Sequence, residues 1–154
     1  QMLDGLNEER IVIAAECVGL GELALEAGAE YASEREVFGR KIGANQAIQH
    51  PLAEAYARVT AAKQTVYSAA DAVTRDGDAT AVGARANVAK YLAADAAFDA
   101  ADAAVQTHGG FGIAREYDVE RDLREARLTR LGPITQELAL NFGAENEPDL
   151  PPSY

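Results

Sequence analysis

Three short segments of this sequence combine residue types that could bind an anionic ligand. They are residues 35–40 (REVFGR) followed by Gln46, residues 106–112 (QTHGGFG), and residues 124–127 (REAR) followed by Thr135. An arginine presents a planar set of donors that suits phosphate oxygens, and glycines let the backbone approach a ligand closely. Each segment also has a simpler interpretation, because the first arginine could be a charge at a helix end and the glycines could simply end a helix.

Residues that could hold a metal ion or form a disulfide are sparse. Asp95, Asp99 and Asp102 fall on one face of a predicted helix, but no histidine joins them. We therefore interpret them as a solvated acidic face and predict no metal site. The single cysteine, Cys17, excludes a disulfide framework and a cysteine-rich metal site. His108 lies among the glycines of the second segment, and we interpret it as a hydrogen-bonding loop residue.

The composition is that of one acidic domain. The chain has 154 residues, which suits a single domain of ordinary size. It carries 25 acidic and 14 basic side chains, a formal net charge of -11, which excludes a general binder of nucleic-acid backbones. A hydrophobic fraction of 48% is enough for a core, and neither a run of 18 apolar residues nor a secretory leader occurs. We therefore expect a cytoplasmic protein with no nucleic-acid or membrane partner.

Long amphipathic helices must position the three segments. Over residues 46–75 apolar residues recur at steps of three and four, in a stripe formed by Leu52, Ala55, Val59, Ala62, Val66, Ala69 and Val73. Comparable patterns predict helices over residues 7–33, 79–107, 119–130 and 134–143. We find no strand-like alternation with hairpin signals. The sequence therefore predicts an all-α fold, an up-and-down four-helix-type bundle with long helices.

Local signals mark the ends of these helices. Asn7 is the expected N-cap of the first helix, and residues 36–44 are expected to form a loop. Residues 76–78 (DGD) predict a turn. The proline-rich tail, residues 146–154, is expected to be mobile.

Taken together, in this order and spacing on long helices, the three segments resemble the C-terminal domain of the acyl-CoA dehydrogenase family. The resemblance covers about residues 3–145 and places residues 1–145 in that helical domain. Family members are flavoenzymes, usually tetramers, that also have an N-terminal helical domain and a middle β domain. The resemblance implies that these two domains are absent from this chain, so we expect the chain alone to be inactive.

The resemblance also implies an activity, a cofactor and partners. It implies part of an FAD-dependent enzyme of fatty acid metabolism that oxidises acyl-CoA to trans-2-enoyl-CoA and passes electrons to electron-transfer flavoprotein. A carboxylate removes the α-proton while the β-hydrogen leaves as hydride to flavin N5. A homo-oligomer, a dimer or tetramer, is implied because FAD contacts of this domain cross between subunits. The residues that the resemblance assigns to FAD are Arg35, at the pyrophosphate, with Phe38, Gln46, Gln106, Gly110 and Thr135.

The usual catalytic base of the family is missing. Most members carry it as the glutamate of a Tyr-Glu-Gly-Thr stretch, where this chain reads LGPIT at residues 131–135 and Pro133 replaces the glutamate. Proline also lacks the N–H that helps to hold the thioester oxygen in the family. Isovaleryl-CoA and long-chain dehydrogenases carry the base in a Glu-Arg pair early in the first helix of this domain. Glu9 and Arg10 match that pair, which implies Glu9 as the base and Arg10 as a substrate-binding residue.

Two alternatives remain open at this stage. Glu8 and Glu9 could be ordinary first-turn acids that interact with helix N–H groups, with Glu137 as a more distant candidate for the base. The chain could also belong to a relative that binds flavin or a CoA thioester, or assists assembly, without dehydrogenating. Pro133 favours this second function, while Glu9, Arg35 and the glycine-rich segment favour the enzyme.

Overall fold

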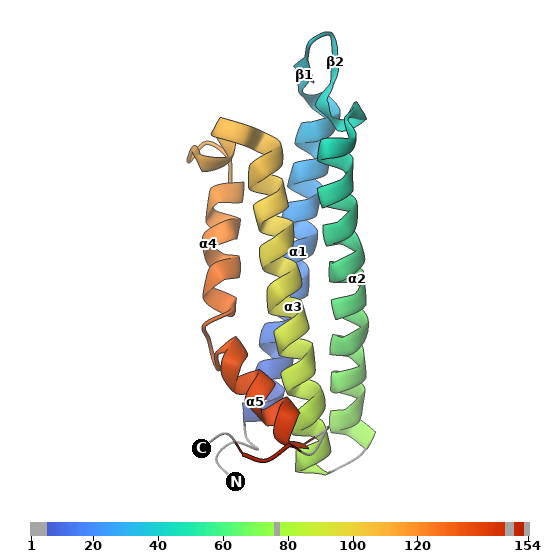
Figure 1. Cartoon of the computed structure of the whole chain (residues 1–154), viewed down its shortest axis with the longest axis vertical. Helices are drawn as coiled ribbons and strands as arrows, with labels where there is room; N and C mark the ends of the chain where they lie inside the picture. Colours follow the sequence, from blue (N-terminus) through green and yellow to red (C-terminus); the bar gives the residue numbers. More distant parts are fainter. Residues whose placement is uncertain (1–5, 76–77, 147–149, 153–154) are drawn as a thin grey trace.

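The computed structural model describes residues 6–75, 78–146 and 150–152, and it is a bundle of long helices (Figure 1). This confirms the predicted fold class. The elements in chain order are helix α1 (Asn7–Glu34), strands β1 (Glu36–Val37) and β2 (Arg40–Lys41), the 3-10 turn η2 (Ile42–Ala44), helices α2 (Gln46–Arg75) and α3 (Ala79–His108), the 3-10 turn η3 (Gly109–Ile113), and helices α4 (Val119–Thr129) and α5 (Gln136–Asn146).

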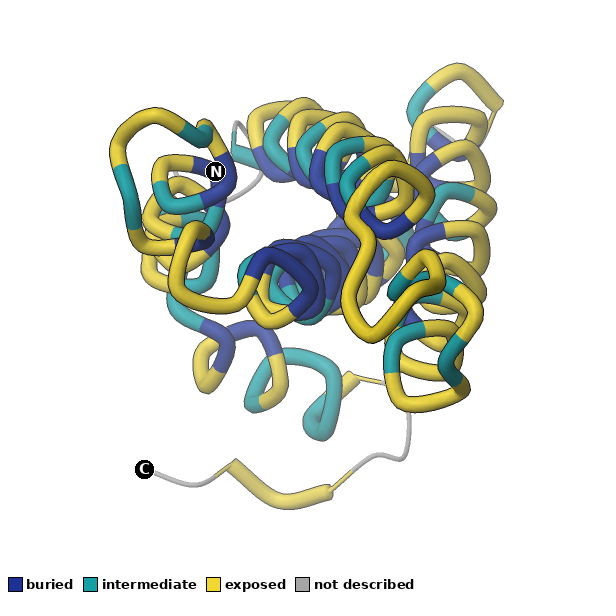
Figure 2. The backbone as a smooth tube through the Cα atoms, turned by 90° about the horizontal axis from the view of Figure 1, so that it is seen from above, coloured by how far each residue is buried: buried dark blue, intermediate teal, exposed yellow. Residues whose placement is uncertain are grey.

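Helix α3 is the centre of the bundle. It packs against α1, α2, α4 and α5, and Figure 2 shows it largely buried among the other elements. Most of its buried residues are alanines, which favour helix and let neighbouring backbones approach closely. Gly21 of α1 marks one such approach, since an added Cβ would lie 2.8 Å from the Val59 side chain on α2. Small residues therefore hold the three long helices together.

The segment after α1 differs from the prediction of a plain loop. β1 and β2 form an antiparallel hairpin in which Val37 pairs with Arg40. Its two turn residues, Phe38 and Gly39, have positive φ values of 55° and 77°. Two-residue hairpins need such a turn, and asparagine or aspartate with glycine is its usual signature. Phenylalanine rarely adopts this conformation, so residues 36–41 carry no recognisable hairpin signal.

The predicted start of α1 was wrong in one respect. Leu6 is the N-cap, and Asn7 is the first helical residue. The Asn7 side chain is buried, and its amide donates to the carbonyl oxygen of Ala79 at 3.0 Å. Asn7 therefore joins the start of α1 to the start of α3 instead of capping its own helix.

Other predicted boundaries fall within three residues of the observed ones. Helix α5 begins at Gln136 and ends at Asn146, later at both ends than predicted. Asp78 caps α3 by accepting from the Thr80 N–H at 3.1 Å, while the other two residues of the predicted turn, 76 and 77, lie outside the described residues. Residues 147–149 and 153–154 of the predicted mobile tail also lie outside them. None of the helices in the described ranges is long and apolar enough to cross a membrane.

Candidate cofactor and substrate sites

An open cavity of about 610 Å³ lies at the end of the bundle where α1 and α3 finish beside the hairpin. This is the upper end of the molecule in Figure 1. The residues that line the cavity are Tyr31, Arg35, Val37, Ile42, Thr107, His108, Gly109, Gly110, Phe111 and Ala114. Two of the predicted FAD residues, Arg35 and Gly110, are thus brought together from segments 75 residues apart in the sequence.

Aromatic rings form one side of this cavity. The rings of Tyr31 and His108 stack with their centroids 4.1 Å apart, and Tyr117 meets both rings edge-on. Phe111 lies 5.6 Å from Tyr117, centroid to centroid. His108 is buried, and its Nδ1 lies 2.8 Å from the carbonyl oxygen of Ala104, so it is a structural hydrogen-bonding residue. The side chains present flat apolar surface to the cavity.

Arg35 is the cation of the cavity. It follows the last residue of α1 and is exposed, and its backbone N–H donates to the carbonyl oxygen of Tyr31. Among the described residues no carboxylate forms an ion pair with its guanidinium, whereas nearby Glu36 pairs with Lys41 at 3.0 Å. An exposed, uncompensated arginine beside an open cavity is suited to bind an anion such as a phosphate.

The glycines after α3 expose backbone to the same cavity. Gly109 ends the helix with a φ of 61°, a conformation that favours glycine. No atom lies within 4 Å of where a Cβ would stand on Gly109 or Gly110. Open space therefore lies beside the Cα atoms of both residues, where a ligand can approach the backbone.

The other predicted FAD residues are spread around this end. Phe38, at the tip of the hairpin, is fully exposed. Gln46, the first residue of α2, is also exposed. Gln106 lies on another side of α3, where it lines a separate hollow with Pro51 of α2. Thr135 is elsewhere, directly before α5. One copy of the chain therefore does not bring all six predicted residues to one surface.

The predicted base lies far from the cavity. Glu9 is exposed in the first turn of α1, near the lower end of the bundle in Figure 1. Its neighbour Arg10 is buried, with only 3% of its surface exposed. The Arg10 guanidinium donates to the side-chain oxygens of Asn7, at 3.0 Å, and Asn87, at 3.4 Å. Burial lowers the pKa of Arg10.

Arg10 also lines a small hollow of about 230 Å³ between α1, α3 and α5. Ile134 lines the same hollow, so the start of α1 lies close to the segment that precedes α5. This is the segment in which Pro133 stands where most of the family has its glutamate. The predicted base and substrate residues thus share one region with residues 131–135.

Glu137 is poorly suited to be the base. Its carboxylate accepts hydrogen bonds from its own backbone N–H and from the Thr135 hydroxyl, and these bonds lower its pKa. A general base at neutral pH needs the opposite shift. The Thr135 hydroxyl also lies 3.4 Å from the Leu138 N–H, so it acts as a cap of α5.

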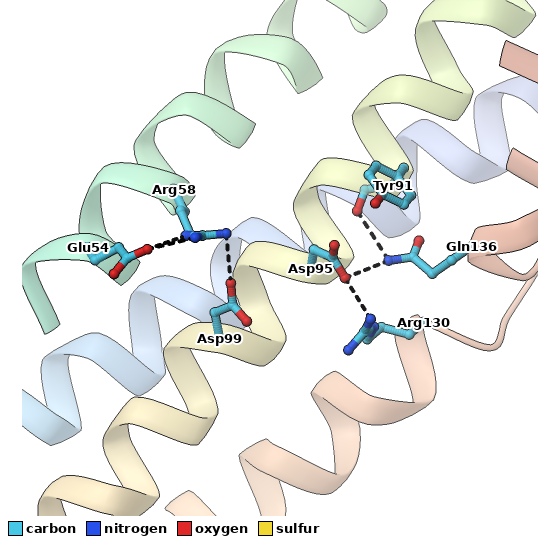
Figure 3. Close-up of polar contacts among 7 residues, drawn as sticks. All are labelled: Glu54, Arg58, Tyr91, Asp95, Asp99, Arg130 and Gln136. Atoms are coloured by element: carbon cyan, nitrogen blue, oxygen red, sulfur yellow. Dashed lines mark hydrogen bonds and ion pairs between the residues drawn. The ribbon is translucent and has the colours of Figure 1, made fainter. Parts of the chain in front are cut away.

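The three aspartates on α3 have separate surroundings. Asp95 pairs with Arg130, and Asp99 pairs with Arg58 on α2 (Figure 3). Asp102 is exposed. Within the described ranges no three His, Cys, Asp or Glu side chains are placed to hold a metal ion. The predicted solvated face is thus partly exposed, and at Asp95 and Asp99 it carries ion pairs with basic side chains from α2 and from the end of α4.

The fold is that of a known class of protein. A family model described as acyl-CoA dehydrogenase, C-terminal domain, matches residues 1–147. The chain therefore belongs to the acyl-CoA dehydrogenase family, which confirms the resemblance carried by the three segments.

Individual relatives agree with this assignment. The chain is 44% identical over 154 residues to acyl-CoA dehydrogenase FadE12 of Mycobacterium tuberculosis, covering 100% of this chain and 39% of that protein. It is 45% identical over 133 residues to an acyl-CoA dehydrogenase of Bacillus subtilis, covering 86% of this chain and 34% of that protein. The solved structure of butyryl-CoA dehydrogenase from Megasphaera elsdenii matches 92% of this chain and 36% of its own, with a TM-score of 0.87 and 33% identity. The chain thus spans about two fifths or less of these relatives.

Proposed function

We propose that this chain is the C-terminal domain of an FAD-dependent acyl-CoA dehydrogenase in which Glu9 is the catalytic base. The observation that carries the proposal is the cavity at the end of α1 and α3, where Arg35, open glycine backbone and aromatic rings meet. These are the groups that a dinucleotide cofactor needs, since it combines phosphates with flat rings. Membership of the family supports the same cofactor.

The residues of this chain would divide the binding of FAD between them. Arg35 would bind the pyrophosphate oxygens, and the Gly109 and Gly110 backbone would lie against the cofactor. Phe38 is fully exposed at the tip of the hairpin, where it can cover the cofactor of a neighbouring subunit. Bound flavin supplies the acceptor for the β-hydrogen, which leaves the substrate as hydride.

Glu9 would perform the proton transfer. Its carboxylate would take the α-proton of the acyl-CoA, and the electron pair of that C–H bond would become part of the new α,β double bond. Arg10 is held by Asn7 and Asn87, so it fixes the first turn of α1 from which Glu9 projects. The exposure of Glu9 leaves room for a substrate to cover it.

The proposal includes the partners of the protein. We propose a cytoplasmic homo-oligomer of fatty acid metabolism that transfers electrons to electron-transfer flavoprotein. The oligomer follows from the distribution of the FAD residues, which one copy does not gather at a single surface. The chain matches only 39% of FadE12. The remaining contacts to substrate and flavin would therefore come from polypeptide outside this sequence.

Pro133 supports a second candidate function, a relative that binds flavin or a CoA thioester without oxidising it. Residues 131–135 contain no acidic side chain, so this segment supplies no base. The two functions are separated by anaerobic addition of a panel of acyl-CoAs to the complete natural polypeptide with its FAD. Bleaching of the flavin absorbance by at least one acyl-CoA supports the dehydrogenase. Tight binding of acyl-CoAs without bleaching contradicts it and supports the non-dehydrogenating relative.

A further inference from the structure

One carboxylate on α3 holds both ends of the α4–α5 connection, which we define as residues 130–135. Asp95 Oδ1 accepts from Arg130 Nη2 at 3.0 Å, at the start of the connection. The same oxygen accepts from Gln136 Nε2 at 2.8 Å, directly after its end. Figure 3 shows both partners converging on Asp95 from one side. Side chains at both ends of the connection therefore bind the same atom of α3, Asp95 Oδ1.

Two further contacts bind this connection to α3. Lys90 Nζ donates to the carbonyl oxygen of Ile134 at 2.7 Å, and the Lys90 side chain is completely buried. Gln136 Nε2 also lies 3.5 Å from the carbonyl oxygen of Tyr91. Lys90, Tyr91 and Asp95 lie within two turns of one helix, so a rigid element fixes the start, the interior and the end of the connection.

Asp95 is the charged acceptor that the side chains of Arg130 and Gln136 share. Gln136 is 7% exposed, and its Oε1 is buried without a hydrogen-bond partner among the described residues. Within the same ranges the buried Nε of Arg130 also has no partner. Hydrogen bonds to a charged group are stronger than neutral ones, and buried donors that lose them are costly. Removal of the Asp95 carboxylate would therefore take the charged acceptor from both ends of the connection and leave the Lys90 contact in its interior.

We propose that Asp95 is a positioning residue that sets the shape of the α4–α5 connection against the acyl-CoA. This inference rests on the proposed function, which brings the thioester to this region beside Glu9. The connection contributes Leu131, Pro133 and Ile134, of which Leu131 is 52% exposed, and it contributes no acid. It acts through its shape and its peptide groups, and both are fixed from α3.

The chain offers a matched control for Asp95. Asp99 lies one turn further along α3 and also forms an ion pair, with Arg58 Nη1 at 3.3 Å. Arg58 is bound in turn to Glu54 at 2.6 Å, so this pair joins α3 to α2 (Figure 3). Replacing Asp99 thus removes a similar carboxylate and ion pair but leaves the hydrogen bonds and the ion pair of the α4–α5 connection in place.

The experiment compares Asp95→Ala, Asp95→Asn and Asp99→Ala in the complete natural polypeptide with its FAD. It measures hydrogen exchange in residues 131–135, the thermal midpoint, and the rate of flavin reduction over a range of acyl-CoA concentrations. We expect Asp95→Ala to accelerate exchange in 131–135 and to lower the saturated rate of flavin reduction about tenfold. Asp95→Asn should restore most of both, because its side-chain oxygen still accepts from Gln136. Asp99→Ala should leave both at wild-type values.

The outcomes separate this inference from the function on which it rests. Wild-type exchange in 131–135 for Asp95→Ala would overturn the inference, as would equal rate losses in the Asp95 and Asp99 variants. A wild-type protein whose flavin no acyl-CoA reduces would instead overturn the proposed function. The exchange data would then still decide whether Asp95 fixes the connection. If Asp95→Ala does not fold, Gln136→Leu, which removes one of the two hydrogen bonds to Asp95, carries the comparison, and wild-type exchange in residues 131–135 for that variant would overturn the inference.

Discussion

Glu9 and Arg35 lie at opposite ends of the same helix. They are 26 residues apart on α1, which at 1.5 Å per residue separates them by about 39 Å. A single helix packed on α3 along its length holds this separation fixed. One FAD molecule does not span that distance, so the two residues of one copy would serve two different flavins. The proposed function thus requires at least two copies of the chain.

This geometry predicts complementation between two impaired variants, one that lacks the base and one that loses its FAD. In a mixed dimer of Glu9→Gln and Arg35→Ala copies, one of the two sites receives an intact Glu9 from one copy and an intact Arg35 from the other. Random exchange of subunits makes about half of the dimers mixed, so about a quarter of the sites should regain flavin reduction. The measurement is the flavin-reduction amplitude of the complete natural polypeptides, before and after subunit exchange. Absence of recovery, with mixed oligomers demonstrated, would contradict the arrangement.

Arg35→Ala should weaken the retention of FAD and leave the fold intact. Its guanidinium is exposed, and no described carboxylate pairs with it, so its loss costs less than about 0.5 kcal/mol of unfolding free energy. A charge-assisted contact to phosphate contributes about 1.5–3 kcal/mol, which corresponds to at least a tenfold loss of affinity. The ratio of FAD to protein after gel filtration measures the effect. Arg75→Ala, at the far end of α2, removes an exposed arginine paired with Asp71 and should retain FAD like the wild type.

Two neighbouring glycines should respond in opposite ways to alanine. A Cβ on Gly112 would lie 2.5 Å from the carbonyl oxygen of Val105, and backbone cannot move aside easily, so Gly112→Ala should destabilise the fold by about 2 kcal/mol or more. A Cβ on Gly110 meets no atom within 4 Å, so Gly110→Ala should keep its stability but weaken FAD binding from the cavity side. Urea unfolding and FAD titration measure the two effects. Equal stability of both variants would be inconsistent with this packing.

The buried carboxyl of Asp122 should make the fold less stable as pH rises. It is 3% exposed, and burial raises the pKa of its carboxyl above the ordinary value of 3.8. The folded state then binds more protons than the unfolded chain, so this group lowers the unfolding free energy as pH rises from 3.8 to its raised folded pKa. Asp122→Asn should therefore stabilise the fold by about 1 kcal/mol at pH 7 and lose that advantage below pH 3.8.

The control for this prediction lies on the same helix. Glu125 of α4 is exposed, so Glu125→Gln changes the net charge by the same amount without relieving a buried carboxylate. Urea unfolding of both variants between pH 3 and pH 7 checks the difference. A stabilisation that is equal in the two variants would mean that net charge, and not burial, is responsible.

The sequence predicts the long helices well because their signals are local and repeated. The regular apolar stripe and the residues flanking it placed α2 at residues 46–75, the range observed. The hairpin was not predicted because Phe38 has a positive φ, which its residue type disfavours. The N-cap of α1 was predicted at the wrong residue because the hydrogen-bond partner of Asn7, the carbonyl oxygen of Ala79, lies 72 residues away in the sequence. Local patterns do not contain such long-range contacts.

The residues of the candidate sites also fall into two groups, those that local motifs indicate and those that depend on contacts between distant segments. Arg35 and Gly110 could be predicted from their motifs, and the fold places both at one cavity. Tyr31, which lines the cavity with His108, and Tyr117, whose ring packs edge-on against both, were missed. Tyr31 stands one turn before Arg35, so its spacing was a usable signal, whereas the position of Tyr117 depends on the path of the chain after α3. The burial of Arg10 depends on Asn87, 77 residues away, and no local pattern indicates it.

The role of Glu9 as the base is tested most directly by the rate at which acyl-CoA reduces the flavin after Glu9 is replaced. Glu9→Gln and Glu8→Gln are compared anaerobically with the wild type, in the complete natural polypeptide with its FAD. Both side chains are exposed in the first turn of α1, so they form a matched pair. We predict that Glu9→Gln binds FAD and acyl-CoA normally but reduces flavin at least 100-fold more slowly, about the usual contribution of a general base. Glu8→Gln should keep the wild-type rate. Equal wild-type rates in both variants would contradict the central claim that Glu9 takes the α-proton.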